Sequence, residues 1–201
     1  MRVRTHANPF SYTERTKNID YSLLLPKNIF LDFEIGSGQG FFLKEYAIKH
    51  SERNIIGTEI RKPLFLRLKN ELISQNIKNA IILNSRAEFC IEDNILDNSI
   101  DKFFIFHPDP WLKNKHHKRR IINNDFLNLM YKKLKNGGKI YISTDVETLW
   151  LDMNKIINLN KKFTKLDFDP FWEEDYFTDW SIFSKNDNRK NFFGTFCKIK
   201  L

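Results

Sequence analysis

The sequence predicts an α/β fold, with a mostly parallel sheet and helices on both of its faces. Short apolar segments alternate with amphipathic ones along the chain, and the apolar segments are hydrophobic almost throughout. Strands that alternate with helices pair in parallel, and a parallel sheet covered on both faces has strands without a polar side. A length of 201 residues suits one domain with a single large core.

The expected elements follow from the hydrophobic pattern, which becomes regular after residue 28. We expect strands at 30–35, 54–60, 80–83, 101–106 and 139–143, and two more after Phe163. We expect helices at 41–50, 63–73, 123–135 and 146–158. Glycine is a common stop for a helix, so the third of these should end at Asn136-Gly137-Gly138. We therefore divide the chain into an N-terminal arm, residues 1–28, and one folded domain, residues 29–201.

Composition excludes several classes of protein. The formal net charge is +8, which either keeps a protein in solution or attracts a polyanion, and clustering of the charges decides between them. Cys90 and Cys197 lie far apart without a CxxC motif, so we expect neither zinc nor a disulfide framework. No apolar run approaches the ~20 residues that span a bilayer, and the start lacks the apolar stretch of a signal peptide. We expect a cytoplasmic protein without metal and without a membrane span.

A glycine-rich loop follows the first strand, in the segment Glu34-Ile35-Gly36-Ser37-Gly38-Gln39-Gly40. Glycines suit such a loop because its backbone turns sharply and lets a ligand approach closely. Glu59 ends the second strand about 20 residues later, the spacing at which a carboxylate holds ribose hydroxyls. Both a nicotinamide cofactor and S-adenosylmethionine fit this pattern. The spacing GxGxG and the carboxylate of Glu34 favour the second, because that cofactor is cationic and a pyrophosphate would be repelled.

A basic run follows the fourth strand, in the segment His107-Pro108-Asp109-Pro110-Trp111-Leu112-Lys113-Asn114-Lys115-His116-His117-Lys118-Arg119-Arg120. A charge run is usually only a solvated surface. This one lies at the carboxyl end of a central strand, where ligands bind in open α/β sheets, and its cations oppose the dipole of the next helix. We expect the cations to contact RNA phosphates and Trp111 to stack on a base. Asp109, held between two prolines, is a candidate catalytic acid.

Four segments together resemble the tRNA (guanine-N7)-methyltransferases. They are the glycine loop 34–40, Gly57-Thr58-Glu59-Ile60-Arg61, the stretch from Pro108-Asp109-Pro110-Trp111-Leu112-Lys113 through Lys118-Arg119-Arg120, and Ser143-Thr144-Asp145. The opening Arg2-Val3-Arg4-Thr5-His6-Ala7-Asn8-Pro9 is similar to the start of some members. The resemblance reaches about residue 150 and is most specific in the basic run.

The resemblance implies a Rossmann-like class I methyltransferase fold, with seven strands of which the last is antiparallel. It implies transfer of a methyl group from S-adenosylmethionine to N7 of a guanine in the tRNA variable loop, with Asp109 as the catalytic residue. The residues expected to hold the cofactor are Glu34, Gly36, Gly38, Glu59, Arg61, Arg86, Ala87 and Asp109. Those expected to contact tRNA are Lys113, Lys118, Arg119, Arg120, Asp145, Thr178 and Ser181.

Three positions depart from the family pattern. Arg86 stands where the family usually has Asp or Asn on the adenine side, Thr178-Asp179-Trp180-Ser181 lacks the final Glu of a C-terminal motif, and His107 replaces an apolar residue. Two alternatives therefore stay open. One is an RNA-binding homologue without catalysis, and the other is a methyltransferase that acts on a different RNA. The sequence does not predict whether an accessory subunit or a second copy joins the chain.

Overall fold

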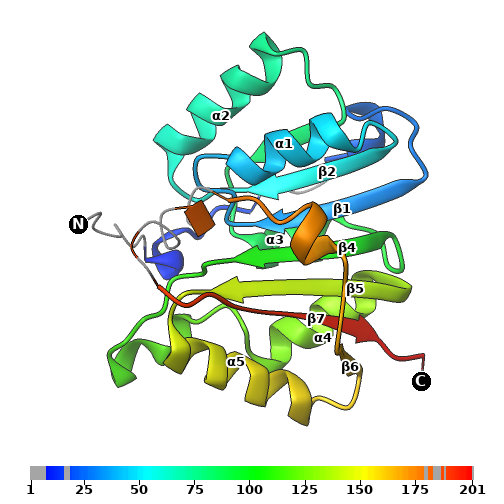
Figure 1. Cartoon of the computed structure of the whole chain (residues 1–201). Coiled ribbons are helices and arrows are strands. Elements are labelled where there is room, and N and C mark those ends of the chain that lie inside the picture. Colours follow the sequence, from blue (N-terminus) through cyan, green and yellow to red (C-terminus); the bar gives the residue numbers. More distant parts are fainter. Residues whose placement is uncertain (1–7, 16–18, 179–180, 183–186, 188, 201) are drawn as a thin grey trace.

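The computed structural model describes residues 8–15, 19–178, 181–182, 187 and 189–200, and it contains one seven-stranded sheet (Figure 1). The strands are β1 (Phe30–Ile35), β2 (Arg53–Thr58), β3 (Ala80–Leu83), β4 (Ile100–Phe106), β5 (Leu134–Thr144), β6 (Phe163–Leu166) and β7 (Phe192–Lys198). Their order across the sheet is β3-β2-β1-β4-β5-β7-β6. The strands β1 to β5 pair in parallel, and β7 is antiparallel to both of its neighbours, as its opposed arrow in Figure 1 shows. The predicted fold class is confirmed.

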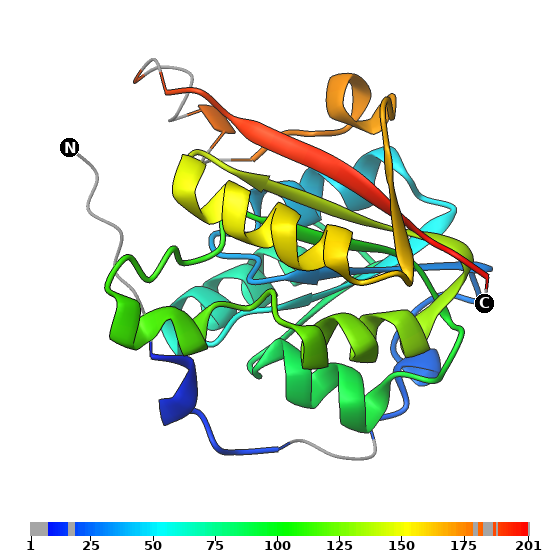
Figure 2. The same cartoon turned by 90° about the horizontal axis from the view of Figure 1, so that it is seen from below.

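Helices cover both faces of the sheet. One face carries α1 (Phe41–Lys49), α2 (Lys62–Ser74) and the short α6 (Phe171–Glu174), which share an aromatic-rich core cluster. The other carries α3 (Ala87–Asn94), α4 (Asn124–Lys133) and α5 (Glu147–Leu159), which lie in a row in Figure 2. Three short 3-10 helices complete the description: η1 (Pro9–Ser11), η2 (Tyr21–Leu23) and η3 (Asn114–Arg119). Among the described residues, no helix is long and apolar enough to cross a membrane.

Several elements differ from the sequence-based expectation, including α6, which was not predicted, and β2, which ends at Thr58 and not at residue 60. Helix α3 was not predicted, and its buried side chains are only Ala87, Cys90 and Ile91. Strand β5 begins at Leu134, five residues before the predicted start at 139, and pairs Leu134 with Ile100 of β4. Gly137 has φ +74, so the glycine supplies an irregularity within a strand and not the end of the preceding helix.

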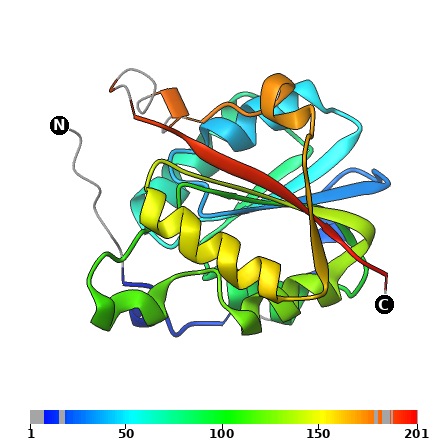
Figure 3. The same ribbon diagram turned by 60° about the horizontal axis from the view of Figure 1, so that its bottom comes forward.

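The described part of the arm is attached to the domain. Tyr21 and Leu25 are buried in the core cluster that also contains α3 and α4. Further upstream, the Arg15 guanidinium donates to Asp93 on α3 at 2.7 Å from both Nε and Nη2. Figure 1 and Figure 3 show η1 and η3 at the same end of the domain, where the parallel strands finish. The arm therefore reaches the end of the sheet at which a ligand site is expected.

A buried ionic cluster lies near the opposite end of the strands. The Asp32 side chain is fully buried on β1, and Arg53 donates to both of its oxygens at 2.6 and 2.7 Å. The Tyr46 hydroxyl on α1 donates to Asp32 at 2.9 Å. The carboxylate thus has three hydrogen bonds, which offset part of the cost of burying its charge, and burial still raises the pKa of Asp32.

Candidate cofactor and substrate pocket

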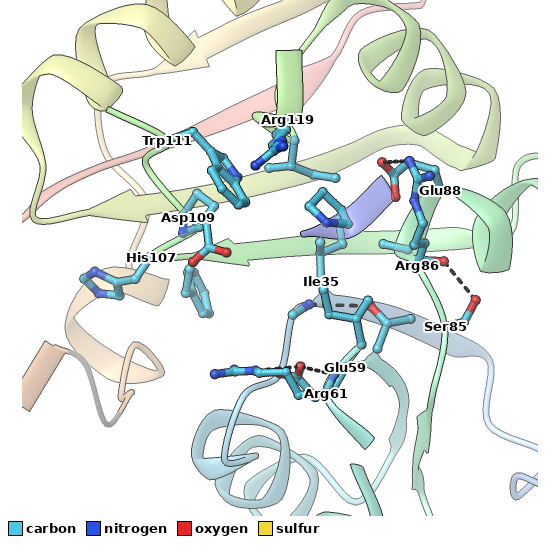
Figure 4. A pocket seen from close by; sticks show the side chains of 18 residues that line it. Ile35, Glu59, Arg61, Ser85, Arg86, Glu88, His107, Asp109, Trp111 and Arg119 are labelled. Carbon is cyan, nitrogen blue, oxygen red and sulfur yellow. Dashed lines mark hydrogen bonds and ion pairs between the residues drawn. The ribbon is translucent and has the colours of Figure 1, made fainter. Parts of the chain in front are cut away.

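A pocket of about 190 Å³ lies where the carboxyl ends of β1, β2, β3 and β4 meet (Figure 4). Its walls are formed by Pro9, Ile35, Gly36, Thr58, Glu59, Ile60, Arg61, Ser85, Arg86, Ala87, Glu88, Phe106, His107, Pro108, Asp109, Trp111, Arg119 and Ile121. In Figure 4, Asp109 and Trp111 stand on one side, and Arg86 and Glu88 stand on the other. This is the edge of an open α/β sheet at which ligands bind.

The glycine loop reaches the pocket next to β1, where Gly36 lines it. Gly36, Gly38 and Gly40 have φ values of +75, +58 and +75, a region that side chains rarely adopt. A Cβ on Gly40 would lie 2.2 Å from Leu68 on α2, so this glycine also lets two helices approach. The loop leaves its backbone open toward the pocket at Gly36, where an added Cβ would meet no atom within 4 Å.

Glu34 lies beneath this loop at the end of β1 and is buried, with 4% of its surface exposed. Its Oε2 atom has no hydrogen-bond partner among the described residues. Burial raises the pKa of Glu34 to about 7, and the negative charge of Glu59 adds to the shift. A hydrogen bond from Ser37 lowers the pKa and offsets part of the shift. The unsatisfied Oε2 atom is still costly to bury, and a cationic ligand group at the loop would satisfy it.

Glu59 directly follows β2 and is also buried, but its carboxylate is fully hydrogen-bonded. The backbone N–H of Gly38 donates to Oε2 at 2.9 Å, and the backbone N–H of Arg61 donates to Oε1 at 2.8 Å. The Arg61 guanidinium adds Nε to Oε1 and Nη2 to Oε2, each at 3.0 Å. Arg61 is the N-cap of α2, so the same turn starts the helix and closes over the acid.

The N-terminus of α3 forms a further wall of the pocket. Arg86 is the N-cap, and its side chain gives the helix no capping hydrogen bond. Instead, its guanidinium lies 4.4 Å from the ring centre of Phe89 and 5.4 Å from that of Phe10, and it pairs with Glu88 at 3.0 Å. Phe10 belongs to η1, so the cation–π contact joins the arm to the pocket wall.

Asp109 is held in a strained loop after β4. His107 and Trp111, on either side of Pro108-Asp109-Pro110, have φ values of +47 and +42. Non-glycine residues in this region cost on the order of 1–3 kcal/mol each and occur most often at functional sites. The hydrogen bond to Glu59 raises the pKa of Arg61 most, burial lowers it, and the charge of Asp109 adds a smaller rise. Asp109 therefore acts electrostatically on Arg61, which lines the same pocket.

The basic run divides into two kinds of residue. Lys113, Lys115 and Lys118, on or beside η3, are exposed. Arg119 lies with its guanidinium 4.8 Å from the ring centre of Trp111 and lines the pocket. Arg120 is buried and donates to the Pro110 carbonyl at 2.9 Å and to Asp152 at 2.8 Å, so it fastens the loop to α5.

The predicted substrate residues near the C-terminus lie outside the pocket wall. The Asp145 side chain is buried after β5, 3.5 Å from His107 Nδ1 and 3.1 Å from Arg189 Nη1. Thr178 and Ser181 hydrogen-bond each other, with the Ser181 backbone N–H 2.8 Å from the Thr178 hydroxyl. Asp179 and Trp180 of the proposed motif, and residues 2–7 of the proposed start, lie outside the described residues.

The structure therefore groups about half of the predicted site residues. Those that line the pocket are Gly36, Glu59, Arg61, Arg86, Ala87, Asp109 and Arg119. Sequence reasoning did not assign Pro9, Ser85 and Glu88 to the site, although all three line it. Ser85 lies in the loop after β3 and Glu88 in the first turn of α3, so the rule that ligands bind beyond strand ends offered a signal for both. Within the described part of the chain, no group of three or more His, Cys, Asp or Glu side chains is arranged to hold a metal ion.

The strand order, the antiparallel last strand and a glycine-lined pocket at the carboxyl ends define a class I methyltransferase fold. Solved structures with the same fold include the 16S rRNA methyltransferase KamB, at TM-score 0.63 and 12% identity, covering 94% of this chain and 97% of that one. A 30S ribosomal A1408 methyltransferase from an uncultured bacterium has TM-score 0.55 and 19% identity, covering 91% of this chain and 96% of that one.

The chain belongs to the family described as putative methyltransferases, whose model matches residues 28–195. A tRNA (guanine-N(7)-)-methyltransferase of Pseudomonas putida (strain F1) is 36% identical over 129 residues, or 64% of this chain and 54% of that one. The corresponding protein of Stutzerimonas stutzeri is 38% identical over 127 residues, or 63% of this chain and 53% of that one. The chain thus spans about half the length of the curated relatives it matches.

Proposed function

We propose that the protein transfers a methyl group from S-adenosylmethionine to N7 of a guanine in tRNA, in the variable loop. The observation that carries the proposal is the pocket itself, in which Asp109 and Trp111 share one cavity with Gly36 and Glu59. The family match and the names of the relatives support the same activity. We also propose residues 29–201 as the catalytic domain and residues 1–28 as its arm.

The residues present fit this cofactor. The unpartnered Oε2 of Glu34 offers a buried negative charge beside the glycine loop, where an ammonium group would satisfy it. Glu59 at the end of β2 is the acceptor for ribose hydroxyls, and Arg61, Arg86 and Ala87 close the same side of the pocket. Bound there, S-adenosylmethionine would supply a methyl group on a positively charged sulfur.

The reaction requires the protein to orient the two substrates and does not require it to transfer a proton. Guanine N7 carries a lone pair and no proton, so no general base is required. Proximity and orientation can supply about 7–11 kcal/mol in ideal cases, and the strained loop 107–111 holds the residues that would position the base. Trp111 offers a stacking surface, stiffened by Arg119. Asp109 offers a negative charge that stabilises the purine as it becomes cationic.

We propose that tRNA phosphates contact the exposed side chains of the basic run, chiefly Lys113 and Lys118, and that Arg119 approaches the substrate from the pocket wall. Arg120 acts on the same surface by holding the loop against α5. Asp145, Thr178 and Ser181 lie farther along the same end of the sheet. We propose that they meet the tRNA beyond the target base.

The test is to incubate the purified protein with labelled S-adenosylmethionine and unmodified tRNA, digest the RNA, and identify the labelled nucleoside. The proposal expects 7-methylguanosine, at a position within the variable loop. Another methylated nucleoside would assign the chain to a different RNA target. Binding of tRNA without label transfer, in a protein that still binds the cofactor, would identify it as a homologue without catalysis.

A further inference from the structure

The strand order dictates where each part of the proposed cofactor lies, so the following inference rests on the proposed function. Gly36 follows β1, Glu59 follows β2, and Ser85 to Glu88 follow β3, and these strands are neighbours in the order β1-β2-β3. With the amino acid part at Glu34 and the ribose at Glu59, the next strand end along the row is that of β3. The base must therefore lie against the first turn of α3.

That turn offers a defined pattern of hydrogen-bonding groups. The Glu88 carboxylate lines the pocket with 29% of its side chain exposed, and Arg86 Nη2 holds its Oε1 at 3.0 Å. No described residue donates to Oε2. The first backbone N–H groups of α3 have no carbonyl to reach within the helix, and Arg86 does not cap them. One acceptor and a set of donors thus stand next to each other.

Arg86 is fixed in turn, because its guanidinium is packed between the rings of Phe10 and Phe89. The two rings hold the Arg86 guanidinium in place, and the ion pair with Arg86 in turn holds the Glu88 carboxylate. Figure 4 shows the two side chains lying together along the wall opposite Asp109.

We propose that Glu88 selects adenine as the base of the cofactor, with Arg86 as the residue that positions it. An ionised carboxylate can only accept hydrogen bonds, and the amino group of adenine donates one. The adjacent ring nitrogen N1 of adenine accepts, which matches an amide donor of α3. Hypoxanthine has the reverse pattern, with a carbonyl oxygen at position 6 and a proton on N1. Its carbonyl oxygen would meet the Glu88 carboxylate, acceptor against acceptor, and its N1–H would meet an amide of α3, donor against donor.

The test is calorimetric binding of S-adenosylhomocysteine and of S-inosylhomocysteine, which differ only in this base edge. Wild-type protein should prefer the adenosyl compound by about 10- to 100-fold. Glu88→Gln should reduce this ratio at least about tenfold, partly by binding the inosyl compound more tightly, because the new amide can donate to the carbonyl oxygen. A merely structural role of Glu88 would weaken both compounds equally.

Glu92→Gln is the matched control. Glu92 lies one turn further along α3, pairs with Arg15 at 2.5 Å, and is not part of the pocket wall. It should leave the ratio unchanged. An unchanged ratio in Glu88→Gln would overturn the inference and leave the proposed function intact. Failure of the wild-type protein to bind S-adenosylhomocysteine would overturn both.

Discussion

The Arg61 guanidinium lies along the Glu59 carboxylate, with Nε 3.0 Å from Oε1 and Nη2 3.0 Å from Oε2. Together with the two backbone N–H donors, each oxygen accepts two hydrogen bonds. A ribose hydroxyl can donate to Glu59 only if the Arg61 guanidinium gives up at least one of its two hydrogen bonds to the carboxylate. Arg61 is also attracted by Asp109, so we expect cofactor binding to shift the Arg61 guanidinium toward Asp109.

Glu59→Gln should weaken binding of S-adenosylhomocysteine by about 1–3 kcal/mol, because a charge-assisted hydrogen bond to the ribose is lost. Calorimetry measures the change. Glu71→Gln is a suitable control, because Glu71 also pairs with two cations, Lys44 and Arg67, but lies outside the pocket wall. Equal dissociation constants for wild type and Glu59→Gln would remove Glu59 from the cofactor site.

Cofactor binding should depend on pH through Glu34. Its pKa of about 7 means that the carboxylate takes up a proton as the pH falls below 7, and a protonated Glu34 cannot pair with an ammonium group. The affinity for S-adenosylhomocysteine should therefore fall between pH 7 and pH 5.5. Glu34→Gln should bind weakly and lose this acid limb. A wild-type affinity that is constant over this range would contradict the assignment.

The same residue predicts a gain in stability on substitution. The folded-state pKa of about 7 lies above the ordinary 4.5, so the folded protein holds the proton more tightly than the unfolded chain does. The free energy of unfolding therefore falls as pH rises from 4.5 to 7. Above pH 7, Glu34→Gln should be more stable than wild type by up to about 3 kcal/mol, and near pH 4.5 the difference should vanish.

Urea unfolding at pH 5 and pH 8.5 measures this difference. The exposed Glu45→Gln on α1 should change little at either pH and serves as the control. If Glu34→Gln is destabilised at pH 8.5, the buried carboxylate has a partner that offsets its burial.

Asp109→Asn should lower turnover by about 100-fold or more while leaving the dissociation constants of tRNA and cofactor nearly unchanged. The reason is the proposed action of its charge on the cationic purine, which would form only as the reaction proceeds. Single-turnover methylation separates the chemical step from binding. Asp97→Asn, at an exposed carboxylate that pairs with Lys132 and with the buried Lys133, should keep wild-type turnover because it lies outside the pocket wall. Normal turnover in Asp109→Asn would show that the acid only shapes the loop.

The basic run should divide into a binding group and a stabilising residue. Lys118→Ala should flatten the log–log salt dependence of tRNA affinity by roughly 0.7–0.9, the effect of one lost phosphate contact, without changing thermal stability. Arg120→Ala should lower the melting temperature, because the Pro110 carbonyl and Asp152 lose their partner. Lys162→Ala, far along the chain at an Asn128 contact, is the control. Identical salt slopes for wild type and Lys118→Ala would show that η3 is only a solvated surface.

The sheet could be predicted from the sequence because each buried strand has its own apolar run, and strand ends then indicate the edge where ligands bind. Helix α3 escaped prediction because it has only eight residues, about two turns, which is too short for a helical repeat of apolar residues to stand out. The start of β5 was misplaced because glycine ends helices more often than it bends strands. Only pairing of Leu134 with Ile100, a contact between distant segments, decides between the two.

The sequence predicts where the site lies, because it predicts where the strands end. It does not predict in which direction each side chain points. Glu59 and Asp109 line the pocket because they directly follow strands. Arg119 and Arg120 are neighbours in one basic run, yet the first lies on Trp111 and the second is buried against Asp152. The 3-10 conformation of η3 determines that Arg119 points toward the pocket and Arg120 toward α5. The pattern of charges in the sequence does not predict that conformation. Pro9 lines the pocket through the packing of the arm, which is a tertiary contact.

The Asp32–Arg53 cluster near the far end of the strands has a genetic consequence. Losing either member leaves the other charge buried without its partner, at a cost of about 3–5 kcal/mol, which is a large part of the stability of a domain. In a cell, substitutions at Asp32 or Arg53 should reduce the amount of folded protein. Growth at lower temperature should restore that amount, and with it the activity. Substitutions at Asp109 should leave the amount normal and resist such rescue. A screen for lost tRNA modification should therefore yield two classes of alleles, one at each end of the same strands.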